Sequence, residues 1–362
     1  MSLVLDRVSR SVAGVTHVDD VSLTLERRSL NVLLGPTLAG KTSLMRLMAG
    51  LDVPTSGRVR FDERDVTGVP VRKRSVAMVY QQFINYPTLS VFENIASPLR
   101  VARMARDEIE RRVGEVAALL KLTPYLGRLP LHLSGGQQQR TALARALVKG
   151  ADLVLLDEPL ANLDYKLREE LREELPRIFE ASGAIFVYAT TEPTEALLLG
   201  GNTATLWEGR VTQFGPTAEV YGRPRDRRTA ALFSDPPLNA LAIDKRGGSL
   251  VLATGATVAT PDALLRLPDG PHEIGFRAHH LLLSKPSTTA IALTGKVALT
   301  EITGSESFIH ADLGVARLVA LVRGVHEIDP GATAEFFVDP RALFVFNASG
   351  RVVVAPDPAA AA

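Results

Sequence analysis

The chain has 362 residues, of which 46% are apolar, and its 41 Lys and Arg nearly balance its 40 Asp and Glu. This length suggests two domains at roughly 150 residues each, and the balanced charge excludes the global basic field typical of proteins that bind nucleic acid. The sequence has no cysteine, which excludes disulfide frameworks and thiolate metal sites. We see no signal peptide and no apolar run of the ~18 residues that span a bilayer, so we expect a soluble chain that meets a membrane only through a partner.

Strands and helices alternate over the first 230 residues, which predicts a parallel sheet with crossover helices. Short apolar runs bounded by Gly or Pro predict buried strands, and a 3.6-residue period predicts helices. The expected strands are 30–34, 151–159 and 185–188, and the expected helices are 42–48, 107–122, 142–148 and 167–182.

The composition and the hydrophobic pattern of the sequence change after residue 222. Residues 222–239 are rich in Pro and Arg and are interpreted as a linker. Beyond them, short strand-like runs are separated by Gly and Pro at regular intervals, which favours a small β-barrel or sandwich. We therefore expect two domains, 1–232 and 233–362.

The segment GPTLAGKT at 35–42 fits the pattern G-x-x-x-x-G-K-[ST] between an expected strand and an expected helix. The backbone N–H groups of such a loop, together with the helix N-terminus, form a cradle for anions. Lys41 would reach the β- and γ-phosphates of a nucleotide, and Thr42 would ligate Mg²⁺. The alternative is a chance glycine-rich turn.

The segment LVLLDE at 153–158 places two carboxylates at the end of an expected strand. Asp157 would offer oxygen ligands to a hard cation, and Glu158 could orient or deprotonate an attacking water. A solvated strand end is the alternative, because acids are common there.

A second glycine-rich segment, LSGGQQQR at 133–140, opens a helix and so offers another anion site. Ser134 supplies a hydroxyl, and Gly135 and Gly136 allow close approach to the backbone. Because one chain needs only one cradle for a γ-phosphate, this segment is predicted to serve the nucleotide of another molecule.

In this order along the chain, these segments resemble those of ABC-transporter ATPases. The C-terminal segments 274–281, 300–310 and 342–350 are similar to the barrel domain of the ATPases that serve sugar and polyol importers. The run at 80–98 is most like one of the two unlike ATPases of bacterial glycerol importers. The motifs that carry the resemblance are GPTLAGKT (35–42), VYQQF (79–83), LSGGQQQR (133–140), LVLLDEP (153–159) and ANLD (161–164).

The resemblance implies an α/β fold, with a P-loop nucleotide-binding domain, a helical subdomain at about 86–150 and a small OB-like β-barrel at the C-terminus. It implies a transport-coupled ATPase that uses ATP and Mg²⁺ on the cytoplasmic face of the bacterial inner membrane. The implied partners are a second ABC ATPase, two transmembrane permease subunits and, indirectly, a solute-binding protein, but no nucleic acid. A small polyol or sugar, glycerol first, is the implied solute.

The resemblance also assigns roles to individual residues. Glu158, Gln81 and Thr191 occupy catalytic positions, and Thr42, Gln81 and Asp157 are the metal ligands. The nucleotide-binding positions are Val12, Gly35, Pro36, Thr37, Leu38, Ala39, Gly40, Lys41, Thr42, Ser43, Ser134, Gly135, Gly136 and Gln137.

The chain departs from this family at three places. Thr191 stands where the family has a histidine that contacts the γ-phosphate, although Thr191 or Thr190 could simply satisfy the strand end. Leu38 and Ala39 replace small residues of the P-loop. Val12 replaces the aromatic residue that stacks on adenine, and the nearby ring of His17 is interpreted as a surface side chain. We therefore expect that the site in which this chain binds its own nucleotide is impaired. The residues with which the chain completes the nucleotide site of a partner are expected to be intact.

Three functions are compatible with the motifs. The first is the nucleotide-binding subunit of an importer. The second is a catalytically weak structural or regulatory subunit that lends its LSGGQ segment to a partner ATPase. The third, an ABC protein acting on DNA or ribosomes, predicts long coiled-coil inserts, metal-binding cysteines or a second cassette, and the sequence shows none of these.

Overall fold

The computed structural model describes residues 2–82, 84–161 and 165–357. Phe83 of the VYQQF segment and residues 162–164 of the ANLD segment lie outside the described residues. Within the described ranges, no helix combines the length and the apolar character that crossing a bilayer requires.

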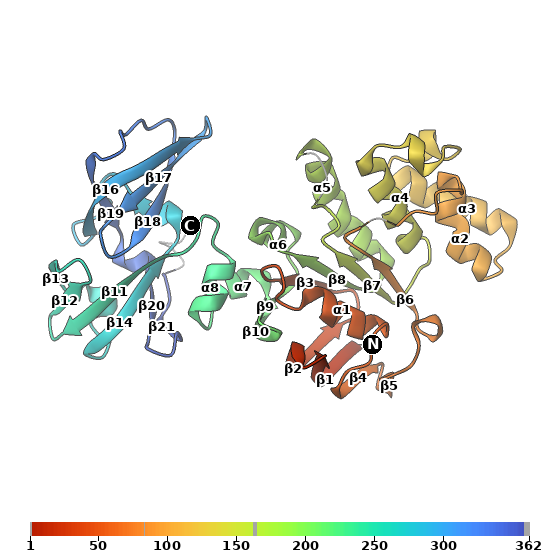
Figure 1. Ribbon diagram of the computed structural model, residues 1–362, viewed down its shortest axis with the longest axis horizontal. Helices are drawn as coiled ribbons and strands as arrows, with labels where there is room; N and C mark the ends of the chain where they lie inside the picture. Colours follow the sequence, from red (N-terminus) through yellow and green to blue (C-terminus); the bar gives the residue numbers. More distant parts are fainter. Residues whose placement is uncertain (1, 83, 162–164, 358–362) are drawn as a thin grey trace. The chain divides into compact units, whose positions relative to one another are not determined.

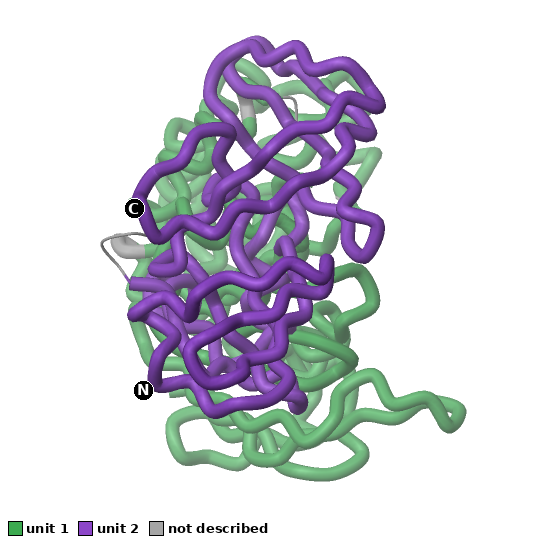
Figure 2. Tube along the Cα trace, turned by 90° about the vertical axis from the view of Figure 1, so that its left-hand side faces the viewer, with its two compact units in different colours: residues 1–217 green, residues 218–362 purple. Residues whose placement is uncertain are grey.

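The chain forms two compact units, Met1–Thr217 and Ala218–Ala362 (Figure 2). The second unit begins earlier than the expected boundary at 232/233. Its first residues are held by its own core, since the buried guanidinium of Arg277 lies 3.6 Å from the ring centroid of Tyr221 and donates to the carbonyl oxygen of Tyr221 at 2.7 Å. The segment interpreted as a linker is therefore partly helical, and it contains α8 (Arg227–Leu232), which follows α7 (Thr217–Gly222).

The first unit is built on a six-stranded sheet in which β6, β7, β8, β3 and β9 run parallel and β10 is antiparallel to β9. The strands predicted at 30–34, 151–159 and 185–188 correspond to three neighbouring central strands, so the parallel sheet is confirmed. From one edge to the other the strands are β10 (Arg210–Pro216), β9 (Asn202–Trp207), β3 (Leu30–Leu34), β8 (Ile185–Thr190), β7 (Leu153–Asp157) and β6 (Val76–Val79).

A second, antiparallel sheet lies on the other side of helix α1 (Lys41–Ala49). Leu44, Met45 and Leu47 of α1 are fully buried in one core with side chains from both sheets. This burial fixes the start of α1, and therefore Lys41 and Thr42, relative to the ends of the parallel strands. The strands of the second sheet, in order, are β2 (Val15–Glu26), β1 (Ser2–Val12), β4 (Ser56–Phe61) and β5 (Arg64–Asp65).

Three helices form the predicted helical subdomain and gather next to β6 (Figure 1). They are α2 (Val91–Val101), α3 (Arg106–Leu119) and α4 (Gly135–Leu147). Helix α4 begins earlier than the periodic pattern predicted, because Ser134 caps it. Helices α5 (Tyr165–Ser182) and α6 (Pro193–Leu199) flank β8 along the chain.

The second unit consists of two antiparallel sheets with one shared apolar core, to which β11, β14, β16 and β19 all contribute. The predicted C-terminal β domain is confirmed, and β11 is a strand that the sequence patterns missed. One sheet contains β13 (Thr257–Ala259), β12 (Ser249–Leu252), β11 (Asn239–Arg246), β14 (Gly270–Phe276), β20 (Phe344–Phe346) and β21 (Val352–Val354). The other contains β15 (Leu281–Leu282), β19 (Thr333–Val338), β16 (Ile291–Ile302), β17 (Glu306–Asp312) and β18 (Arg317–Arg323).

Candidate nucleotide site

The segment Gly35–Gly40 joins the end of β3 to the start of α1. A Cβ atom on Gly35 would lie 2.5 Å from the carbonyl oxygen of Leu206, and one on Gly40 would lie 2.5 Å from that of His17. Gly40 also has a φ of 101°, which favours glycine. Both glycines are therefore required by close backbone approach, and the loop is held tightly between β9 and β2.

Lys41 is folded back onto this loop. Its ammonium donates to the carbonyl oxygens of Gly35 at 2.7 Å and Pro36 at 3.1 Å, and it lies 3.4 Å from Glu158 Oε1. Burial lowers the pKa of Lys41, while the carboxylates of Glu158 and Asp157 act in the opposite direction. The ammonium is thus largely desolvated and already positioned to bind an anion.

The end of β7 brings the two predicted carboxylates to the same place. Asp157 Oδ2 accepts a hydrogen bond from Thr42 Oγ1 at 2.8 Å, and Glu158 Oε2 accepts one from Gln81 Nε2 at 2.8 Å. Glu158 has a φ of 46°, a conformation that is uncommon for residues other than glycine and that clusters at active sites. Five residues from three distant parts of the sequence therefore meet at one edge of the sheet.

The residues present fit a magnesium ion. Burial raises the pKa of the Asp157 carboxyl, and the negative charge of Glu158 adds to this effect. A divalent cation would offset that burial, and carboxylate, hydroxyl and amide oxygens are the ligands that Mg²⁺ prefers. Asp157, Thr42 and Gln81 would hold the ion, which when bound neutralises charge on phosphate oxygens.

A hollow of about 530 Å³ lies over these groups. It includes most of the predicted loop, and it adds residues from β2 and from the β9–β10 turn that sequence reasoning did not assign to the site. No local signal marks these added residues, because they reach the loop only through tertiary packing. The lining residues are Val15, Thr16, His17, Thr37, Leu38, Ala39, Gly40, Lys41, Thr42, Ser43, Gln81, Glu158, Glu208 and Gly209.

The predicted LSGGQ segment does not line this hollow. Ser134 is exposed and is the N-cap of α4, where its hydroxyl accepts from the Gln137 N–H at 3.4 Å while the Gln137 side chain accepts from the Ser134 N–H at 3.0 Å. Gly135 is also exposed, and Gly136 is half-buried. The helix start is therefore well formed and open to solvent, away from the phosphate loop of its own chain.

Thr191 directly follows β8, whose last residues are hydrogen-bonded to Gly35 and Glu158. The Gly35 N–H donates to the carbonyl oxygen of Thr190 at 3.4 Å, and the Glu158 N–H donates to that of Ala189 at 3.0 Å. Thr191 is exposed, and its short side chain carries a hydroxyl and no ring nitrogen. The end of β8 thus borders the site where the family's histidine is expected, with a smaller polar group in its place.

The carboxylate after Thr191 is held by two arginines of α5. Glu192 lies 3.3 Å from Arg168 and 3.2 Å from Arg172. The negative charge is therefore paired on the α5 side of the turn, and it does not stand in for the missing histidine as a phosphate ligand, since like charges repel.

Leu38 lies at the tip of the phosphate loop with a φ of 69°, and its side chain is 95% exposed. The left-handed conformation costs a non-glycine residue about 1–2 kcal/mol. The loop therefore keeps its shape despite the replacement, and it presents an apolar side chain to solvent at the edge of the hollow.

A buried polar cluster supports the end of β8 from behind. Glu195, which is only 3% exposed, accepts hydrogen bonds from Tyr188 Oη at 3.0 Å and from Thr190 Oγ1 at 2.6 Å, and it lies 3.4 Å from Arg172. Burial, followed by the carboxylate of Glu195, raises the pKa of the Tyr188 hydroxyl well above its usual range. The cluster keeps this tyrosine protonated as a donor and fixes the turn that carries Thr191.

We expect Tyr188→Phe to lower the free energy of unfolding by about 1.5–3 kcal/mol, because the buried carboxylate loses a donor while the ring volume is kept. Chemical denaturation of the full chain measures the change. Tyr165→Phe is the matched control, since Tyr165 is 79% exposed. Equal shifts for the two variants would show that the cluster does not stabilise β8.

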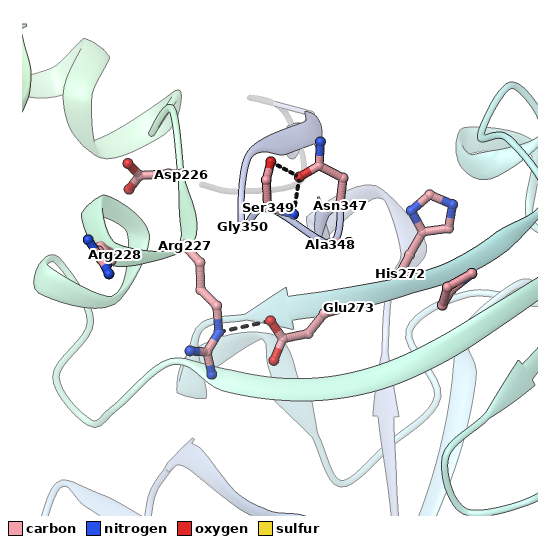
Figure 3. A pocket seen from close by; sticks show the side chains of 10 residues that line it. Asp226, Arg227, Arg228, His272, Glu273, Asn347, Ala348, Ser349 and Gly350 are labelled. Atoms are coloured by element: carbon pink, nitrogen blue, oxygen red, sulfur yellow. Dashed lines mark hydrogen bonds and ion pairs between the residues drawn. The ribbon is translucent and has the colours of Figure 1, made fainter.

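A second hollow, of about 600 Å³, lies on the C-terminal unit between β14, α8 and the β20–β21 turn (Figure 3). Its charged walls pair with each other, as Arg227 Nε lies 2.8 Å from Glu273 Oε2. Asn347 Oδ1 accepts from the backbone N–H of Ser349 at 3.1 Å and from its hydroxyl at 2.8 Å. These contacts build the turn itself, so the hollow has a structural explanation and is not assigned a ligand.

A family profile described as "ABC transporter" matches residues 18–161. The chain is 36% identical to the sn-glycerol-3-phosphate import ATP-binding protein UgpC of Ruegeria pomeroyi, over 86% of this chain and 87% of that protein. It is 33% identical to the trehalose/maltose import ATP-binding protein MalK of Thermococcus litoralis, over 92% of this chain and 94% of that protein.

Among solved structures, the chain is similar to the dimeric structure of MJ0796, a bacterial ABC transporter cassette, and to a post-hydrolysis state of the same cassette bound to ADP and Pi. Each comparison has a TM-score of 0.54 and 27% sequence identity, and each covers 59% of this chain and 98% of the other.

Proposed function

Because this chain belongs to the ATP-binding proteins of ABC importers, we propose that it couples ATP binding and hydrolysis to uptake of a small polyol or sugar, glycerol first. The observation that carries the proposal is the convergence of five polar side chains on one phosphate loop. Lys41 would bind phosphate oxygens, Asp157 and Thr42 would hold Mg²⁺, and Glu158 would activate water with Gln81 beside it. The chain would work at the cytoplasmic face of the inner membrane, bound to two permease subunits and served by a solute-binding protein.

We further propose that its partner ATPase is a different chain. The open LSGGQ segment at the start of α4 suits a second molecule's nucleotide, and the dimeric arrangement of the related cassette is compatible with this role. The chain's own site has Thr191 in place of the histidine, and it carries a strained leucine in its loop. A homodimer would repeat these departures in both sites, so a partner that keeps the histidine would restore one efficient site.

Glycerol is proposed because of the likeness at residues 80–98 to the ATPases of glycerol importers. The names of the relatives add sn-glycerol 3-phosphate and the disaccharides trehalose and maltose as alternatives. All are rich in hydroxyl groups, and the solute itself would touch the permease and the binding protein rather than this subunit.

Deleting the gene is expected to reduce uptake of labelled glycerol, while uptake of labelled sn-glycerol 3-phosphate and maltose stays normal. Complementation with the wild-type gene should restore glycerol uptake, and complementation with Lys41→Ala should not. Normal glycerol uptake together with loss of one of the other two solutes would reassign the substrate.

A second candidate function is a catalytically weak regulatory or structural subunit, which Thr191 and the strained Leu38 favour. It differs from the first in a single measurable quantity, the hydrolysis that the chain's own site performs in the assembled transporter.

A further inference from the structure

His17 is the extra residue of a β-bulge. Strand β1 pairs Arg10 with Val18 and Ser11 with Thr16, so His17 lies between the two pairs on β2 and has no counterpart on β1. The hydroxyls of Ser11 and Thr16 lie 3.0 Å apart and tie the strands together just beyond the bulge. Bulges redirect a side chain and occur often beside active sites.

The bulge is fixed to the phosphate loop through backbone contacts. The carbonyl oxygen of His17 packs so closely on Gly40 and Gly209 that Cβ atoms at those positions would approach it to 2.5 Å and 3.0 Å. The Asp19 N–H donates to the carbonyl oxygen of Gly209 at 2.9 Å, and the Gly209 N–H donates to that of Ala39 at 3.0 Å. Residue 17 is therefore held at a constant position beside the start of α1.

Among the residues that line the hollow, counted over the part of the chain that is described, His17 is the only one that carries an aromatic ring. The residue is exposed, so its ring is open to contact by a ligand. Val12 pairs with Val15 near the tip of the same hairpin and is not part of the lining. An aromatic residue thus lies at the hollow at position 17, and residue 12 is not part of the lining.

We propose that His17 provides the stacking surface for the nucleobase, in place of an aromatic residue at position 12. The inference rests on the proposed nucleotide site. A purine stacks on any aromatic face, and the contact is worth about 1–3 kcal/mol per base. The phosphates would then be bound by the loop and the base by the bulge, two elements that the backbone contacts keep together.

The test compares two ligands that differ in the nucleoside alone. Dissociation constants of Mg-ATP and Mg-tripolyphosphate are measured by calorimetry on the full chain, for wild type, His17→Ala, His17→Phe, Val12→Ala and the control His279→Ala. His279 is exposed on the C-terminal unit. His17→Ala is expected to weaken ATP binding about tenfold, which corresponds to 1.4 kcal/mol, and to leave tripolyphosphate binding unchanged. His17→Phe should retain the affinity for ATP.

A spectroscopic measurement supports the same comparison. Ring protons of His17 in the NMR spectrum should shift when ATP binds and stay in place when tripolyphosphate binds. Equal affinities of wild type and His17→Ala for ATP would overturn the inference while leaving the nucleotide site intact. A loss confined to Val12→Ala would also overturn it. A wild-type chain that binds neither ligand would instead contradict the proposed function.

Discussion

Replacing Ser134 by Arg is expected to remove most of the ATPase activity of the assembled importer, whereas Glu158→Gln in the same chain should leave much of it. Ser134 opens α4 and is exposed, and it belongs to the segment proposed to complete the partner's nucleotide site. A guanidinium there adds bulk and charge where a phosphate and its donors need close approach. Glu158 would act only on the chain's own nucleotide, whose proposed site has Thr191.

The size of the asymmetry follows from the missing contact. A lost donor to transition-state charge costs about 3 kcal/mol, or roughly two orders of magnitude in rate. The partner's site would then account for nearly all turnover, so a loss of hydrolysis alone in the weaker site, with nucleotide binding kept, is almost silent in the total rate.

Steady-state hydrolysis by the reconstituted complex measures both variants, with Thr288→Arg as a control that adds the same charge to an exposed residue of the C-terminal unit. Abolished turnover in Glu158→Gln with a mild effect of Ser134→Arg would reverse the asymmetry. An active homodimer of this chain at ordinary rates would show that Thr191 is a tolerated replacement.

Lys41→Ala is expected to lower the affinity for Mg-ATP at least tenfold, because a buried, charge-assisted contact to phosphate is lost. The Lys41 side chain is 5% exposed, and its ammonium is already oriented by the carbonyl oxygens of Gly35 and Pro36, so little ordering is required when a phosphate binds. In the alanine variant the carbonyl oxygens of Gly35 and Pro36 would face the phosphate without a cation between them, which further disfavours binding.

Equilibrium binding to the isolated full chain checks this expectation, with Lys285→Ala as the control for loss of an exposed lysine. A dissociation constant equal to that of wild type would mean that the loop does not bind phosphate. The thermal midpoint of both variants should be recorded, since loss of the contact between Lys41 and Glu158 also changes the protein without nucleotide.

Much of the first unit could be predicted from the sequence, because its signals are local. Apolar runs such as 30–34 end in the loop or the carboxylates that define the site, and the parallel order of their strands brings those ends to one edge. For this reason the loop 35–42 and the pair Asp157 and Glu158 lie together at that edge, and their role in binding nucleotide stays a prediction.

Other features depend on contacts between distant segments and leave no local pattern. The bulge at His17 is defined by its register against β1, and its carbonyl packs on glycines in the loop and in the β9–β10 turn. The arginines of α5 that hold Glu192 lie 24 and 20 residues away along the chain. The helix within 222–239 was missed because its Pro and Arg content is typical of linkers, while Asp226 caps it through its side chain.

The contact between Lys41 and Glu158 would make nucleotide binding an exchange of one anionic partner of Lys41 for another. The ammonium of Lys41 lies 3.4 Å from one oxygen of the carboxylate that would activate water, and Gln81 donates to the other oxygen of the same group. Phosphate oxygens that bind Lys41 compete with Glu158 for one positive charge. In the proposed mechanism, occupancy would therefore release Glu158 as a general base at the moment when there is a phosphate to attack.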